Sequence, residues 1–185
     1  QRAAAAWTAV TLATLPAISL SAQLASTDVA LLMFWAAALL CLVRYWRFSG
    51  LWWVGFGLAF GAGLMSKYAM IYMLLCLPVA LVLVPEMRPL LRTAGLWLGI
   101  LLGLLLFLPN VWWNWTHELA AFSHTAANAN WSGPLLKPHK LAEFAGAQFG
   151  IMGPILLVAF AWAVVRWRRL ASGDRVLLAF GLPVL

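Results

Sequence analysis

The sequence predicts an all-α membrane protein, a polytopic bundle of about six complete transmembrane helices plus part of a seventh. Composition is the first observation: of 185 residues, 65% are apolar and 9% are charged, whereas soluble domains are about 45–50% apolar and about 25% charged. The second is arrangement, because the apolar residues form long runs separated by short basic clusters. A chain of this size cannot bury so much apolar surface internally. Lipid is therefore its main solvent, which excludes an ordinary soluble domain and a disordered chain.

The first two apolar runs are Ala3–Leu24, in which Pro16 predicts a kink, and Val29–Val43. A spanning helix needs about 20 apolar residues, within a range of about 17–25. The two runs are separated by a short polar turn that contains Asp28, and an arginine-rich segment closes the second run. We therefore predict one membrane crossing for each run.

The next run, Leu51–Val84, contains 34 residues and a single charge, Lys67. As one helix it would be about 51 Å long, but the hydrocarbon core of a bilayer is only about 30 Å thick. Two helices that meet at Lys67 would each be about 24 Å long. We predict this hairpin, with its turn slightly below the membrane surface.

Two further runs follow, Ala94–Val111 and one that ends at Val165, and a last run begins at Val176. A polar stretch over residues 112–149 separates the first two of them. We interpret the whole chain, 1–185, as a single transmembrane domain, with 112–149 as a non-cytoplasmic loop within it.

The net charge of +7 comes from 12 basic and 5 acidic residues. If the chain reverses at Lys67, all nine arginines fall on one side of the membrane, and Lys67, Lys137 and Lys140 fall on the other. Basic residues concentrate on the cytoplasmic side of membrane proteins, so the arginine side is predicted to be cytoplasmic. The positive charge is then explained by the orientation of the chain in the membrane, and no nucleic-acid partner is expected.

Two charged residues near the opposite side are the main candidates for function. Asp28 is interpreted either as a ligand at the mouth of a site, since carboxylates near the membrane usually face a cavity, or as a helix N-cap. Lys67 is interpreted either as the ligand of a lipid phosphate or as a side chain that extends to the interface. Gly57 and Gly61 form a GxxxG pair, which predicts close helix packing.

The polar stretch 112–149 is rich in aromatic and histidine residues. Its tryptophans suit an interfacial aromatic belt, and they also suit the stacking of sugar rings. Its histidines lack the spacing typical of zinc ligands. The possible ligand contacts in this stretch are Trp112, Trp113, Asn114, His117 and Glu118.

A series of motifs resembles a known family. The turn Ser26-Thr27-Asp28 precedes a span that closes with Arg44-Tyr45-Trp46-Arg47, and a glycine-rich run then leads to Leu64-Met65-Ser66-Lys67-Tyr68. The segment Leu106-Phe107-Leu108-Pro109-Asn110-Val111-Trp112-Trp113-Asn114 and a His-Glu pair follow. This order resembles the bacterial protein-mannosyltransferase-like glycosyltransferases, integral membrane enzymes of the GT-C class, family 39 type.

The resemblance implies a GT-C-like fold and transfer of a sugar from a polyprenyl-phosphate donor to a lipid or glycan acceptor. The reaction would take place on the periplasmic side of the bacterial inner (plasma) membrane. Lys67 matches the family's basic residue near the donor phosphate, and Asp28 matches an acidic position near that phosphate or a divalent metal ion. The family's catalytic carboxylate would precede Gln1. We therefore expect a part of a longer enzyme, inactive alone, with no catalytic residue of its own.

Two other classes of function are considered. A membrane transporter or lipid flippase also uses broken helices and isolated charges, but here the charges gather toward one face and no internal repeat is visible. A non-catalytic membrane subunit would use Asp28 as a helix cap and Lys67 as an interfacial anchor. Such a subunit would tolerate substitution at both positions.

Overall fold

A computed structural model describes residues 6–11, 27–119 and 138–181, and all regular structure in that part of the chain is helical. The all-α prediction is therefore confirmed for these residues. Most of the predicted span Ala3–Leu24 lies outside them, although residues 6–11 are helical. The elements are α3 (Thr27–Phe48), α4 (Trp52–Ser66), η1 (Tyr68–Ile71), α5 (Tyr72–Leu83), η2 (Pro85–Arg92), α6 (Ala94–Thr116), α8 (Pro138–Val165), η3 (Trp167–Arg169) and α9 (Ser172–Gly181), where η marks a 3-10 helix.

Helices α3 and α6 have the length and composition of membrane-spanning helices. They contain 22 and 23 residues, which at 1.5 Å per residue gives about 33 and 35 Å. Within the described residues, three further apolar helices are shorter: α4, Tyr68–Leu83 and Leu156–Val165. The structure therefore identifies two full-length candidate spans, and the larger number of spans stays a prediction.

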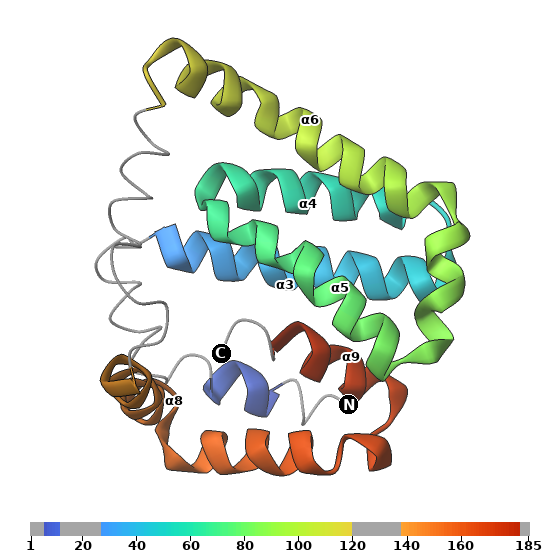
Figure 1. Cartoon of the computed structure of the whole chain (residues 1–185). Coiled ribbons are helices and arrows are strands. Elements are labelled where there is room, and N and C mark those ends of the chain that lie inside the picture. Colours follow the sequence, from blue (N-terminus) through green and yellow to red (C-terminus); the bar gives the residue numbers. More distant parts are fainter. Residues whose placement is uncertain (1–5, 12–26, 120–137, 182–185) are drawn as a thin grey trace.

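The chain reverses direction at Lys67, as the hairpin interpretation predicts. Helix α4 ends at Ser66, Lys67 has an extended backbone (φ −157°, ψ 133°), and η1 begins at the next residue. In Figure 1, α4 leads to this turn and α5 leads away from it in roughly the opposite direction. Gly63 permits the tight turn, because a Cβ there would lie 2.7 Å from Cγ of Met70.

Three helices form a layer with α4 between α3 and α6 (Figure 1). Gly57 and Gly61 of α4 face Gly99 and Gly103 of α6. A Cβ at Gly57 would lie 2.6 Å from the carbonyl oxygen of Gly99, and one at Gly103 would lie 3.1 Å from that of Gly57. The packing predicted for the GxxxG pair is confirmed, and a second GxxxG motif on α6 completes the contact.

Helices α4 and α6 are parallel and keep one register. Gly57 lies beside Gly99, Gly61 beside Gly103, and the hydroxyl of Tyr68 beside Asn110, each pair separated by 42 positions. Helix α6 continues six residues past Asn110, to Thr116, or about 9 Å farther along its axis. Lys67 therefore lies short of the level at which α6 ends, and the depth of the turn relative to the membrane surface stays a prediction.

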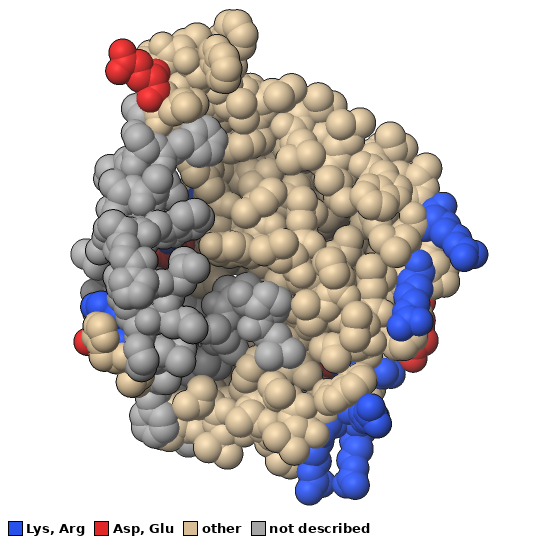
Figure 2. Space-filling model, in the orientation of Figure 1, with Lys and Arg blue, Asp and Glu red and all other residues tan. Residues whose placement is uncertain are grey.

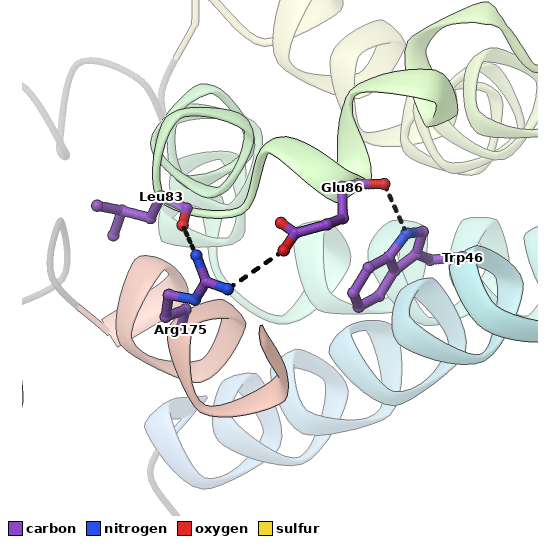
Figure 3. Close-up of polar contacts among 4 residues, drawn as sticks. All are labelled: Trp46, Leu83, Glu86 and Arg175. Atoms are coloured by element: carbon purple, nitrogen blue, oxygen red, sulfur yellow. Dashed lines mark hydrogen bonds and ion pairs between the residues drawn. The ribbon is translucent and has the colours of Figure 1, made fainter. Parts of the chain in front are cut away.

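Arginines gather at the opposite end of the bundle, where α3 ends and α9 begins. Glu86 of η2 accepts hydrogen bonds from Trp46 of α3 (Nε1 to the backbone oxygen, 3.2 Å) and from Arg175 of α9 (Nη2 to Oε1, 3.2 Å). Arg175 also donates from Nη1 to the carbonyl of Leu83, 3.1 Å away (Figure 3). Figure 2 shows basic side chains concentrated around this end and a largely uncharged surface beside them.

The segment 112–149 contains more helix than an irregular loop would. Helix α6 continues through Trp112 to Thr116, because this sequence lacks a helix breaker. The helix stops where Glu118 and Leu119 adopt positive φ angles of 55° and 56°. Helix α8 begins at Pro138 and bends at Gly153, where φ is 73°. Residues 120–137 of the predicted loop lie outside the described part of the chain.

Candidate functional site

The candidate site lies at the end of the bundle opposite the arginines. Helix α3 starts there, α4 ends there, and the last two turns of α6 extend past both. Each helix end supplies polar side chains, namely Asp28 from α3, Lys67 from the α4–η1 junction, and Asn110 and Asn114 from α6. The antiparallel pairing of α3 with α4 and the parallel pairing of α4 with α6 bring these helix ends to the same end of the bundle.

Lys67 and Asp28, the two main candidates from the sequence, form an ion pair between Nζ and Oδ1. Their side chains are 43% and 48% exposed, so both charges remain accessible from outside the bundle. The helix dipoles favour the arrangement, because Asp28 lies in the first turn of α3 and Lys67 directly follows the last residue of α4. Each charge also lowers the cost of holding the other near lipid.

A hydrogen-bonded network lies next to this pair. The hydroxyl of Tyr68 donates to Oδ1 of Asn110 at 2.8 Å, and Nδ2 of Asn114 donates to the same hydroxyl at 3.2 Å. Nδ2 of Asn114 also lies 2.9 Å from the backbone oxygen of Asn110 and 3.1 Å from its Oδ1. The ring of Tyr68 packs edge-on against Phe107, with 5.5 Å between centroids. The network fixes the residue that follows Lys67 to the end of α6.

Asn114 is the buried polar residue of the described core, with 0% of its surface exposed. A buried amide is costly unless its hydrogen bonds are made. Its contacts with Tyr68 and Asn110 meet that requirement. The side chain therefore supports the site from inside, and it does not reach outward as the sequence-based interpretation of a ligand contact requires.

The last turns of α6 carry exposed aromatic rings. Trp112 and Trp115 are strongly exposed, and Trp113 is half-exposed. The ring of Trp113 stacks on that of His117, with 4.3 Å between centroids and 13° between planes. Nδ1 of His117 lies 2.8 Å from the backbone oxygen of Trp113, which holds the ring in this position. The result is a flat aromatic platform at the end of the helix.

The structure thus joins some predicted residues and separates others. Lys67 and Asp28 are in contact, and Asn114 lies one hydrogen bond from Tyr68. Trp112, Trp113, His117 and Glu118 belong to the end of α6 and have no described contact with the ion pair. Tyr68 and Asn110 were not predicted as site residues, although two asparagines four positions apart in an apolar helix are a visible signal.

No group of three or more histidine, cysteine, aspartate or glutamate residues able to hold a metal occurs among the described residues. Asp28 supplies one carboxylate, and that carboxylate is paired with an ammonium group. Divalent cations require several oxygen ligands. These described residues do not fit a complete metal site by themselves.

The fold and the site together define a helical membrane protein with paired charges and an amide network below an aromatic end. Residues 1–113 match the family model described as dolichyl-phosphate-mannose-protein mannosyltransferase, and the chain belongs to this family. The resemblance seen in the sequence motifs is thereby confirmed.

A curated relative is the lipid A galacturonosyltransferase RgtD of Rhizobium johnstonii, which is 36% identical over 185 positions. The match covers 97% of this chain and 38% of the relative, so the chain spans about two fifths of the relative's length. No solved structure matches the chain.

Proposed function

We propose that this chain forms part of an integral membrane glycosyltransferase. The enzyme would move a sugar from a polyprenyl-phosphate donor to a lipid or glycan acceptor on the periplasmic side of the bacterial inner membrane. The observation that carries the proposal is the Lys67–Asp28 ion pair, which lies below the end of α6 and opposite the arginine-rich end. Family membership supports sugar transfer over the transporter and subunit alternatives.

The ends of the bundle support the proposed orientation. Arginines gather at the end of the bundle where η2 contacts α9. Basic residues concentrate on the cytoplasmic side of membrane proteins, so this end would face the cytoplasm. The ion pair would then lie near the periplasmic surface, within reach of a phosphate carried by a membrane lipid. The proposed topology keeps about six complete spans plus part of a seventh, because the Leu51–Val84 run would cross twice and four other runs once each.

Lys67 would bind the donor phosphate. An ammonium group has three donors, so Nζ can keep its contact with Asp28 and also donate to a phosphate oxygen. Asp28 would hold the lysine side chain in place through their ion pair. During transfer, the bond between the anomeric carbon and the phosphate oxygen breaks, and a bond to the acceptor oxygen forms. Lys67 would offset the negative charge that then grows on the departing polyprenyl phosphate.

Other groups complete the reaction. A carboxylate outside these residues would take the proton of the acceptor hydroxyl. The stacked Trp113 and His117 rings would support a sugar ring on an outer face of the stack, because their inner faces cover each other. Metal dependence stays a prediction, because a divalent ion would need ligands in addition to Asp28.

The test is a transfer assay with Lys67→Ala in the full-length protein. The name of the curated relative suggests galacturonic acid and lipid A as the first sugar and acceptor to try, with the sugar supplied on the proposed polyprenyl-phosphate carrier. Loss of a charged transition-state donor typically lowers the rate about 100- to 1000-fold, and Asp28→Asn is expected to lower it by a smaller factor. Lys140→Ala is the matched control, because Lys140 pairs with Glu143 on the surface of α8.

A loss of transfer activity supports the role of Lys67 only if the variant protein is still folded. Thermal melting of each purified variant in detergent shows whether the fold is intact. A folded Lys67→Ala protein with normal transfer activity would contradict the assigned role of the lysine. Absence of any sugar transfer by the unmodified protein, with transport of a solute into liposomes, would contradict the proposed reaction as a whole.

A further inference from the structure

A second binding surface lies at the arginine-rich end, away from the candidate site. The short helix η2 connects α5 to α6 there and is clearly two-sided. Met87 and Leu90 are buried in the core, whereas Arg88, Leu91 and Arg92 are exposed. The apolar face of η2 therefore packs on the protein core, and its basic face is left exposed at the outer surface.

A groove of about 540 Å³ runs between η2 and the end of α5. Its floor and walls are mostly apolar, and its basic edge consists of two arginines from the same short helix. The lining residues are Leu81, Val82, Pro85, Arg88, Pro89, Leu91 and Arg92. Apolar walls beside two guanidinium groups match a molecule that has both a hydrocarbon part and an anionic group.

The positive charge of the groove is not offset by neighbours. Glu86, the acidic residue of η2, is already engaged by Arg175 on α9 (Figure 3). In the part of the chain that the structure describes, no ion pair joins Arg88 or Arg92 to an acidic residue. Nε of Arg88 donates to the carbonyl of Leu81 at 3.1 Å, which fixes its guanidinium group at the edge of the groove.

A neighbouring tryptophan places the groove at headgroup depth. The indole Nε1 of Trp97 donates to the carbonyl of Leu91 at 2.8 Å, and the ring is 55% exposed. Exposed tryptophans with one satisfied polar atom typically lie at the level of the lipid headgroups. With Trp97 at that level, the arginines of η2 would lie at the depth of the bilayer phosphates.

We propose that this groove binds one anionic phospholipid of the leaflet at the arginine-rich end. The lipid phosphate lies between Arg88 and Arg92, and an acyl chain lies along Leu81 and Val82. Lipid bound there fastens the α5–α6 connection to the interface. This site is separate from the one proposed for the donor phosphate and does not depend on it.

The test is native mass spectrometry of the full-length protein in detergent with added phosphatidylglycerol. The double variant Arg88→Gln/Arg92→Gln should bind about 25-fold more weakly, since each arginine near an anionic surface typically contributes roughly fivefold. Arg166→Gln/Arg168→Gln is the matched control, because these arginines contact Trp162 and Trp167 and do not line the groove. The control should bind the lipid as the unmodified protein does.

A second variant keeps both charges and fills the groove. Val82 is 65% exposed, so Val82→Trp should fold and should also weaken phosphatidylglycerol binding. Equal binding of phosphatidylglycerol by the unmodified protein, the double glutamine variant and Val82→Trp would overturn the proposal. Equal losses in the control variant would overturn it as well, because binding would then follow net charge and not the groove.

Discussion

The contact between α4 and α6 makes a sharp prediction for Gly57→Ala. The added Cβ would lie 2.6 Å from the carbonyl oxygen of Gly99 and 3.0 Å from Cβ of Leu102. An ordinary van der Waals separation is about 3.5 Å, so the two backbones must move apart by about 0.9 Å. Overpacking of this kind typically costs about 1–3 kcal/mol in the free energy of unfolding.

The same displacement reaches the candidate site, because one register governs both contacts. If α6 moves as a rigid body, the 2.8 Å hydrogen bond from Tyr68 to Asn110 opens to about 3.7 Å, beyond the usual limit of about 3.2 Å. We therefore expect Gly57→Ala to lower the melting temperature and also to raise the KM for the lipid-linked donor. Melting in detergent and steady-state transfer kinetics measure the two effects.

The matched control is Gly146→Ala. A Cβ at Gly146 would have no heavy atom within 4 Å, and replacing glycine by alanine within a helix typically stabilises it by about 0.5–1 kcal/mol. This control should melt at or slightly above the temperature of the unmodified protein. If Gly57→Ala melts at the same temperature as Gly146→Ala, the close packing of α4 on α6 is refuted.

Two further variants separate the parts of the site. Tyr68→Phe removes the hydroxyl shared by Asn110 and Asn114. Leaving a buried amide with fewer partners typically costs about 1–3 kcal/mol in the free energy of unfolding, so we expect a lower melting temperature. An unchanged melting temperature would show that the network does not support the fold. Trp113→Leu removes the ring that stacks on His117. Because Trp113 is half-exposed, the melting temperature should hardly change, whereas the KM for the sugar donor should rise. An unaltered KM would show that the aromatic platform takes no part in the proposed mechanism.

Several features of the fold were predictable from the sequence. The isolated charge at Lys67, within an apolar run too long for one crossing, predicted the break that the structure shows between α4 and η1. The spacing of Gly57 and Gly61 predicted a close helix contact, which the structure places against α6. These features are local in sequence, and length, hydropathy and residue size are enough to predict them.

The end of α6 was harder to predict. The polar and aromatic composition of residues 112–116 indicated a loop, whereas the helix continues through them. Asn114 looked like a ligand contact from composition alone. Its burial depends on which side of α6 faces Tyr68, and that follows from packing against α4.

The sequence by itself determined that the chain is a membrane protein, that its long third apolar run breaks at Lys67, and which family its motifs resemble. Only the tertiary structure decided which polar groups meet. Asp28 and Lys67 are 39 positions apart, and Tyr68 and Asn110 are 42 apart. No local pattern joins positions so distant. Their contact follows from the register in which three helices pack. The glycines of α4 and α6 let those two backbones approach closely, which fixes the register that joins Tyr68 to Asn110.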